Sequence, residues 1–492
     1  MAKVHVGVCL ALACSLILSP TTSFAQNSKV SESKGIALTI YNQNFGLVKD
    51  SRILELTNGI NYVTCEDVAA KIDPTSVSFT SLTAPNQVVV REQNYKYDLI
   101  DPTTILNKSV GKTARFKQYV GSQVVDLTGV LLNGPSATVG STDGGSSEIA
   151  LGLVLKTPAG IILNPEGQVE LAELPAGLVS KPCLDWKLET DKPGAHDVEI
   201  AYQTSDINWK CDYVAVTNAN DTNCDLTSWV TLDNKSGGTY KEAALKLIAG
   251  DVHKVQDVAA PQQMMEMAMD SAAPAAPPPP QFTEQSFAEY HMYTLAGKTD
   301  VNNNETKQLS LFNASDVPVK KQFIMESEDA RTFGGDIDES GKQKKKIQIK
   351  LEMLNKEDNH LGMPMPKGKV RVYKKDADGA LQFVGEDEID HTPRDEKIRI
   401  YIGDAFDLVG ERRQTINEQP NNHLQRMSYE ITLRNHKKEA AKIQVIEHCY
   451  GDWKVVATSI PHTKKDSHTF EFAADVPANG EVKITYTIEV KM

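Results

Sequence analysis

A period-two alternation of apolar and polar residues recurs along nearly the whole 492-residue chain. It is clear in Asp197–Tyr202 and Ser428–Asn435, and turn signals such as Asn58-Gly59 separate the alternating runs. Because successive side chains of a strand point to opposite faces, this pattern is typical of sheets with one buried face. Segments with a helical period are almost absent, apart from a possible turn or two near Gln414–Gln425. We predict a mainly β protein with very little helix, built from several antiparallel β-sandwich or barrel domains.

Composition and turn spacing divide the chain into domains. We predict an N-terminal β domain at residues 35–180, with a small β-barrel inserted at about residues 105–169, where short strands are punctuated by glycine. A central β-sandwich region follows at residues 181–425. It is interrupted at residues 257–285 by a segment rich in Met, Pro and Ala, which is typical of a disordered or extended linker. Residues 426–492 have the turn spacing of an immunoglobulin-like β-sandwich.

The first 25 residues resemble a secretory signal peptide. Lys3 gives a positive start, Val4–Leu18 form an apolar run, and small residues at Ser23 and Ala25 precede the expected cleavage site. The run is shorter than the ~20 apolar residues that span a bilayer, so we expect cleavage rather than a membrane anchor. No later segment is long and apolar enough to cross a membrane. We therefore predict an exported protein, either periplasmic or extracellular.

The cysteine spacing suggests one disulfide candidate. Five cysteines follow the signal, and Cys211 with Cys224 is the best disulfide candidate, because the two flank a turn between strand-like runs. Two separately buried thiols are the alternative.

The formal net charge is −13, which makes nucleic acid a poor partner. The basic run Lys342–Lys346 is better explained as a solvated strand edge than as a binding patch.

Aromatic residues are frequent in the alternating strands of the central region. Their positions predict that they fill a sandwich core, and a row of rings that stacks on carbohydrate is the alternative. These residues are Trp186, Tyr202, Trp209, Tyr213 and Trp229.

Carboxylates gather around a single histidine between residues 386 and 396. Only alternate members, such as Glu386, Glu388 and Asp390, can converge on one face of a strand. Carboxylates beside an imidazole are able to bind a divalent cation or to act as acid and base. The candidate metal ligands are Asp387, Asp390, His391 and Asp395.

A structural turn explains the same residues. In Asp390-His391-Thr392-Pro393, the Asp390 carboxylate can accept backbone hydrogen bonds and Pro393 can fix the exit of the chain. Nucleophile elbows, HExxH and phosphate-binding loops are absent from the sequence. We therefore expect a turn here, and we assign no catalytic residue and no cofactor.

Several phrases resemble a known family, the exported bacterial proteins that carry domain of unknown function 4139. The phrases are EIAYQTSDINWKCDYVAV (Glu199–Val216), SWVTLDNKSGGTYKEAALKLIAGDV (Ser228–Val252), FAEYHMYTL (Phe287–Leu295), Leu361–Arg413, ITLRNHKKEAAKIQVIEH (Ile431–His448) and the opening LTIYNQNFGLVKDSR (Leu38–Arg52). The resemblance implies a β-rich exported protein whose function is not established.

Two hypotheses follow from the sequence. The first is a non-enzymatic exported protein that binds an unknown protein or cell-envelope component, or acts as a scaffold in envelope assembly. The second is a metal-dependent hydrolase centred on the acidic cluster Asp387–Glu396. A cleft that gathers His391 with Asp387, Asp395 and either His360 or Asp404 would favour the second hypothesis, whereas dispersal of these groups over separate turns would favour the first.

Overall fold

A computed structural model describes residues 27–120, 123–140, 146–254, 281–329, 337–338, 341–376 and 378–491. Strands make up nearly all of the regular structure, which confirms the mainly β prediction. The predicted signal peptide lies outside the described residues, and so do residues 255–280 of the predicted linker. The helical turn considered near Gln414–Gln425 is wrong, because the ends of two paired strands, β29 and β30, occupy that stretch.

The α-helix that is described, α1 (Pro102–Lys108), was not predicted. Its signals are local: Asp101 accepts hydrogen bonds from the backbone N–H groups of Thr103 (2.8 Å) and Thr104 (3.1 Å), and proline occupies the first turn. Two single-turn 3₁₀ helices are also described, η1 (Pro74–Ser76) and η2 (Glu357–Asn359).

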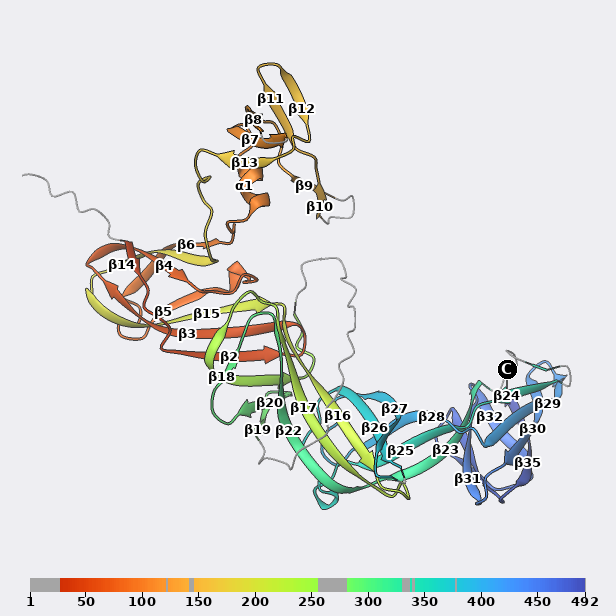
Figure 1. Ribbon diagram of the computed structural model, residues 1–492. Coiled ribbons are helices and arrows are strands. Elements are labelled where there is room, and N and C mark those ends of the chain that lie inside the picture. The colour runs from red at the N-terminus through yellow and green to blue at the C-terminus, as the bar shows by residue number, and fades with distance from the viewer. Residues whose placement is uncertain are drawn as a thin grey trace, which may run out of the picture.

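The largest sheet mixes strands from distant parts of the sequence (Figure 1). Its spatial order is β19 (Phe282–Phe287), β20 (Tyr290–Leu295), β18 (Tyr240–Ala249), β2 (Gly35–Tyr41), β3 (Phe45–Leu56), β15 (Gly194–Ser205) and β5 (Ser78–Ser81), with β21 (Thr299–Val301) also paired to β18. The β2–β18 pair is parallel, with Leu38 opposite Leu245. The boundary predicted near residue 180 cuts through this sheet, because β15 pairs with β3 over its whole length. The predicted linker also ends too late, since β19 begins at Phe282.

Two further sheets pack with the first around one continuous hydrophobic core. One has the order β1 (Asn27–Lys29), β4 (Gly59–Glu66), β14 (Cys183–Thr190) and β6 (Val88–Lys96). The other has the order β22 (Glu305–Pro318), β17 (Asn223–Asn234), β16 (Ile207–Thr217), β26 (Gly368–Lys375) and β27 (Leu381–Ile389). Four of the five central aromatic residues are buried, and Trp229 lies half-buried on the outer face of β17.

The three sheets around the first core are here called the main body. Residues 97–182, here called the insert, leave the main body between β6 and β14 and project from it (Figure 1). They form a sheet with the order β12 (Gly160–Leu163), β11 (Val154–Thr157), β8 (Gln123–Leu131), β7 (Thr113–Val120) and β13 (Gln168–Leu171), beside a hairpin of β9 (Ser136–Gly140) and β10 (Ser146–Ala150). The sheet is open rather than the closed barrel that was predicted, since β12 and β13 are its two edges in the part of the chain described. Its small separate core centres on Phe116 and Leu155.

The C-terminal part has two sheets that enclose a second core, while Leu351, Met353, Ile398 and Ile400 at one end of this part belong to the first core. One sheet has the order β28 (Lys397–Asp404), β25 (Gln348–Leu354), β23 (Lys320–Asp329), β31 (Ala441–His448), β34 (Thr469–Val476) and β33 (His462–Lys464). The other has the order β24 (Lys342–Lys345), β29 (Leu408–Asn421), β30 (Leu424–Asn435), β35 (Gly480–Lys491) and β32 (Asp452–Thr458). The boundary predicted at residue 426 is therefore too late, because β23, β24 and β29 precede it.

A buried ion pair joins the two sheets of this sandwich. Arg412 on β29 donates to both carboxylate oxygens of Glu447 on β31, at 3.2 and 3.0 Å, and to the hydroxyl of Tyr486 at 3.1 Å. Ser327 donates to the same carboxylate at 3.0 Å, and the guanidinium lies 3.9 Å from the ring centre of Tyr429. Both charged side chains are almost fully buried, so each depends on the other for its polar contacts.

Candidate functional site

The acidic cluster starts on β27 and continues into the turn that leads to β28. Glu386 and Glu388 face cations of the neighbouring strand region: Glu386 lies 3.5 Å from Arg371 on β26, and Glu388 lies 3.5 Å from Lys367, which directly precedes β26. Asp390 lies 3.7 Å from the same Lys367, with its side chain 92% exposed. The predicted alternation is therefore confirmed, but these carboxylates face basic side chains across the strand pair.

Asp387 connects the main body to the C-terminal sandwich. One of its carboxylate oxygens accepts the backbone N–H of Glu388 at 2.9 Å, and the other accepts the backbone N–H of Tyr401 on β28 at 2.7 Å. The backbones of the two strands also approach closely, because a Cβ at Gly385 would lie 2.2 Å from the carbonyl oxygen of Ile402. Asp387 thus accepts an N–H from within β28, at the place where two sheets meet.

Asp395 lies in the turn before β28 with a left-handed backbone (φ +64°), and its N–H donates to the carbonyl of Asn355 at 2.7 Å. His360 and Asp404 serve other turns: the His360 ring contacts the Ser315 carbonyl at 2.7 Å, and Asp404 accepts from the Tyr401 hydroxyl at 3.0 Å. The predicted ligands are therefore dispersed. Within the described ranges, no group of three or more His, Cys, Asp or Glu side chains is placed to hold a metal ion.

Of the four candidate metal ligands, His391 borders a cleft with a volume of about 290 Å³, which Asp387, Asp390 and Asp395 do not line. This His391 cleft lies between the turn after β2, the start of β16 and the start of β26. Its lining residues are Asn42, Asn208, Trp209, Lys210, Cys211, Pro366, Lys367, Gly368, Lys369, Glu388 and His391.

The imidazole of His391 is held on both sides. The backbone N–H of Lys367 donates to Nδ1 at 3.1 Å, and the side-chain amide of Asn42 lies 3.1 Å from Nε2. Burial lowers the pKa of His391, and the nearby Lys367 also lowers it, whereas Asp251 and Asp390 act in the opposite direction. The ring is therefore neutral near pH 7, and only a neutral ring can accept the Lys367 N–H.

A buried polar atom at the cleft has no partner in the described part of the chain. The amide oxygen of Asn208 accepts no hydrogen bond there. A buried acceptor without a donor costs free energy, so this position favours a bound group or a water molecule that donates. The Asn42 amide is not counted with it, because a neutral ring that accepts from Lys367 at Nδ1 carries its hydrogen on Nε2, where Asn42 lies. No sequence motif marks Asn208, which is why it was not identified from sequence.

The rim of the cleft is mainly cationic. Lys210, Lys367 and Lys369 line it, against the single carboxylate of Glu388. Among the described residues Lys210 has no ion-pair partner, which leaves its ammonium available to a ligand. The cleft can therefore hold a small anionic group that also carries hydrogen-bond donors.

The predicted Cys211–Cys224 disulfide is wrong. Both thiols are free and buried, because the register of the β16–β17 pair places Cys224 opposite Thr217 and Cys211 opposite Val230, far along the strand. Burial raises the pKa of Cys211 to about 12, so its thiol is not an activated nucleophile in the cleft. The alternative of two separately buried thiols is the one observed.

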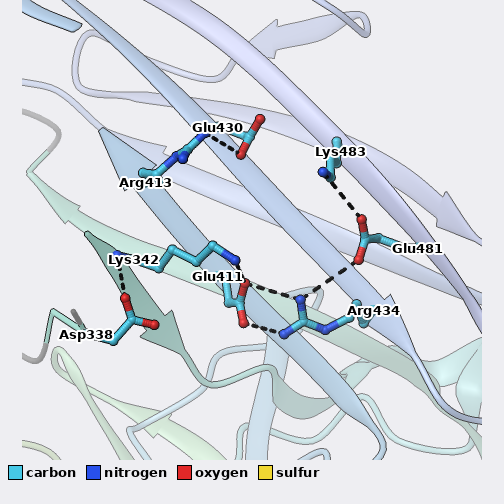
Figure 2. A network of polar contacts seen from close by, with 8 residues as sticks. All are labelled: Asp338, Lys342, Glu411, Arg413, Glu430, Arg434, Glu481 and Lys483. Carbon is cyan, nitrogen blue, oxygen red and sulfur yellow. Dashed lines mark hydrogen bonds and ion pairs between the residues drawn. The ribbon is translucent and has the colours of Figure 1, made fainter. Parts of the chain in front are cut away.

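The basic run Lys342–Lys346 includes β24, an edge strand of the C-terminal sandwich, as expected (Figure 2). The Lys342 ammonium lies 3.1 Å from Glu411, which Arg434 also contacts, and the backbone N–H of Lys342 donates to Asp338 at 3.0 Å. Hydrogen bonding from Arg434 lowers the pKa of Glu411. The Lys342, Arg434 and Glu411 charges offset one another on the sheet surface.

A family model described as Domain of unknown function (DUF4139) matches residues 198–492, more than half of the chain. The chain belongs to the DUF4139 family. The DUF4139 match begins within β15 and contains every residue of the His391 cleft except Asn42. Among curated proteins, none matches this chain. In the described parts of this DUF4139 protein, no helix combines the length and the apolar character needed to cross a membrane.

Proposed function

We propose that this chain is an exported, non-enzymatic binding protein of the bacterial envelope. In this proposal the His391 cleft holds an anionic, hydrogen-bond-donating group of an envelope partner, and the rest of the molecule acts as a rigid scaffold. The observation that carries the proposal is the buried, unpartnered amide oxygen of Asn208 beside a lysine-rich rim.

The chemistry of the partner follows from the cleft. The rim lysines attract a carboxylate or phosphate, while the Asn208 oxygen requires an N–H or O–H donor on the same ligand. His391, neutral near pH 7, adds a hydrogen-bonding group without adding charge. An acidic peptide segment or an acidic, hydroxylated sugar meets both requirements. Export of the chain rests on the signal-like pattern of residues 1–25.

Photo-crosslinking in the native cell tests the proposal. A photoreactive amino acid would replace Lys210 at the cleft or, as the control, Lys438, which is exposed in the turn between β30 and β31 of the C-terminal sandwich. We expect a discrete crosslinked partner from position 210 and none from position 438. Charge reversal by Lys367→Glu should then reduce the crosslinked yield about tenfold, because it places a carboxylate at the rim. Equal yields from positions 210 and 438, or the absence of any adduct at position 210, would rule the cleft out as the binding site.

A further inference from the structure

The hairpin of β11 and β12 ends the sheet of the insert on an apolar edge. In the part of the chain described, β12 pairs with β11 on one side and forms the edge of the sheet on the other. Ile161 and Leu163 of this strand are 63% and 69% exposed. The strand sequence is Gly-Ile-Ile-Leu, without a charged residue. An uncharged, apolar edge strand is a template for pairing with another strand.

Several other sheet edges of this protein carry charge. The opposite edge of the insert, β13, contains Glu170, which pairs with Lys117 on β7. The edge strand β24 consists largely of lysine, and β27 carries the acidic cluster. Charged side chains discourage edge-to-edge association. The uncharged edge β5 is Ser-Phe-Thr-Ser, whereas β12 combines the lack of charge with exposed Ile161 and Leu163.

The backbone groups of β12 that face the open edge can be assigned from its pairing with β11. Thr157 and Gly160 flank a two-residue turn and therefore form a hydrogen-bonded pair. Leu153 and Asn164 are also a hydrogen-bonded pair, since the Asn164 N–H donates to the Leu153 carbonyl at 2.7 Å, and this fits the same alternation. Pairs of this kind recur at every second residue, so the N–H and C=O groups of the intervening Ile161 and Leu163 point away from β11.

The edge is self-complementary. If two copies of β12 run antiparallel about Ile162, Ile161 of each copy lies opposite Leu163 of the other. Both such pairs can exchange N–H and C=O bonds, because these are the residues whose backbone groups face outward. The exposed side chains at positions 161 and 163 lie on the same face of the strand, so each apolar side chain covers its counterpart.

We infer that this chain self-associates through β12, with a second copy extending the sheet of the insert into one continuous sheet across both molecules. The hairpin lies at the end of the insert that is remote from the main body, which leaves space for the second copy (Figure 1). The contact is short, so association is reversible and depends on concentration. This interaction is separate from the His391 cleft and does not depend on the proposed function.

Sedimentation velocity of the purified full-length protein over a range of concentrations tests the inference. We expect a monomer–dimer equilibrium for the unmodified protein. Ile161→Lys/Leu163→Lys places like charges opposite each other in the dimer, as does Ile161→Glu/Leu163→Glu, and each should weaken association at least about tenfold. Mixing the two double variants should restore a dimer, because lysine then faces glutamate in both pairs.

Val124→Lys is the matched control. Val124 is also an exposed apolar residue of the insert (53% exposed), but it lies outside β12, on β8 where that strand pairs with β7, and its replacement should leave the equilibrium unchanged. A protein that stays monomeric at every concentration would overturn the inference. So would double variants that associate as strongly as the unmodified protein, or a mixture of them that fails to dimerise.

Discussion

Neighbouring residues of the acidic segment have different roles. Asp387 accepts a backbone N–H from another sheet, Asp390 projects into solvent, and His391 turns into a cleft. The alternation of Glu386 and Glu388 could be predicted from sequence, because the strand period is local. The partner of Asp387 could not, because Tyr401 lies on a strand of a different sheet. The sequence-based turn prediction had the Asp390 carboxylate accept backbone hydrogen bonds, whereas the structure places it in solvent near Lys367.

Replacing Asp387 should destabilise the protein more than replacing Asp390. Asp387→Ala removes the acceptor for the Tyr401 N–H where two sheets meet, and we expect a loss of about 1–2 kcal/mol in the free energy of unfolding. Asp390→Ala alters an exposed side chain, and we expect a change within about 0.5 kcal/mol. Urea unfolding followed by tryptophan fluorescence measures both, and an equal effect of the two variants would contradict the structural role of Asp387.

His391 should make stability depend on pH. Its pKa is lowered in the folded protein, so the unfolded chain binds the proton more readily. Its contribution to stability is then complete above the ordinary histidine pKa of 6.5 and is lost as the pH falls below that value towards the folded pKa. We expect the difference in unfolding free energy between the unmodified protein and His391→Gln to shrink between about pH 8 and pH 5. A difference that stays constant over this range would show that the ring is not held in its neutral form.

Secondary-structure elements were predicted better than their pairings. Hairpins such as β2–β3 follow from alternation and local turn signals, and these signals lie within a few residues of each other. The parallel pairing of β2 with β18 joins residues some two hundred positions apart, and no local pattern specifies it. The incorrect domain boundaries have the same origin. Turn spacing marks where strands end, but it does not reveal which sheet each strand enters.

The buried ion pair between Arg412 on β29 and Glu447 on β31 tests how two strands of facing sheets stabilise each other. Arg412→Met leaves the Glu447 carboxylate buried without its cationic partner, and we expect a loss of about 3–5 kcal/mol in the free energy of unfolding. Arg412→Met/Glu447→Leu removes both charges and should recover most of that loss. The measurement is chemical denaturation monitored by Trp453, which lies in the same core. If the double variant is as unstable as the single variant, the charge of Glu447 is not the cause.

At the scale of the whole molecule, the main body and the insert have separate cores. The insert leaves and re-enters where β6 and β14 are already paired, with Lys96 opposite Cys183. Backbone hydrogen bonds between Asp98, Ile100 and Val179 bring its two ends together. The strands of the insert were foreseen from their glycine punctuation, but whether they close into a barrel depends on long-range pairing that local spacing does not encode.

Replacing residues 98–180 with a short Gly/Ser turn should leave the main body folded, because the junction closes as a hairpin. We expect the shortened protein to keep its β-type circular dichroism and to change its melting temperature by only a few degrees. A molten or aggregated product would show that the insert stabilises the body. By the inference above, the same variant should also be monomeric.

The position of β2 has a practical consequence for work on related chains. Similarity detects a segment that opens at Val198, partway along β15, yet the neighbours of β15 and β18 in the largest sheet are β3 and β2, which lie upstream of it. A fragment of residues 198–492 lacks β2 and β3, so β18 and β15 would each expose a row of unpaired backbone N–H and C=O groups. Such a fragment should precipitate when expressed alone. For recombinant production, the smallest sensible piece therefore reaches back to at least Gly35.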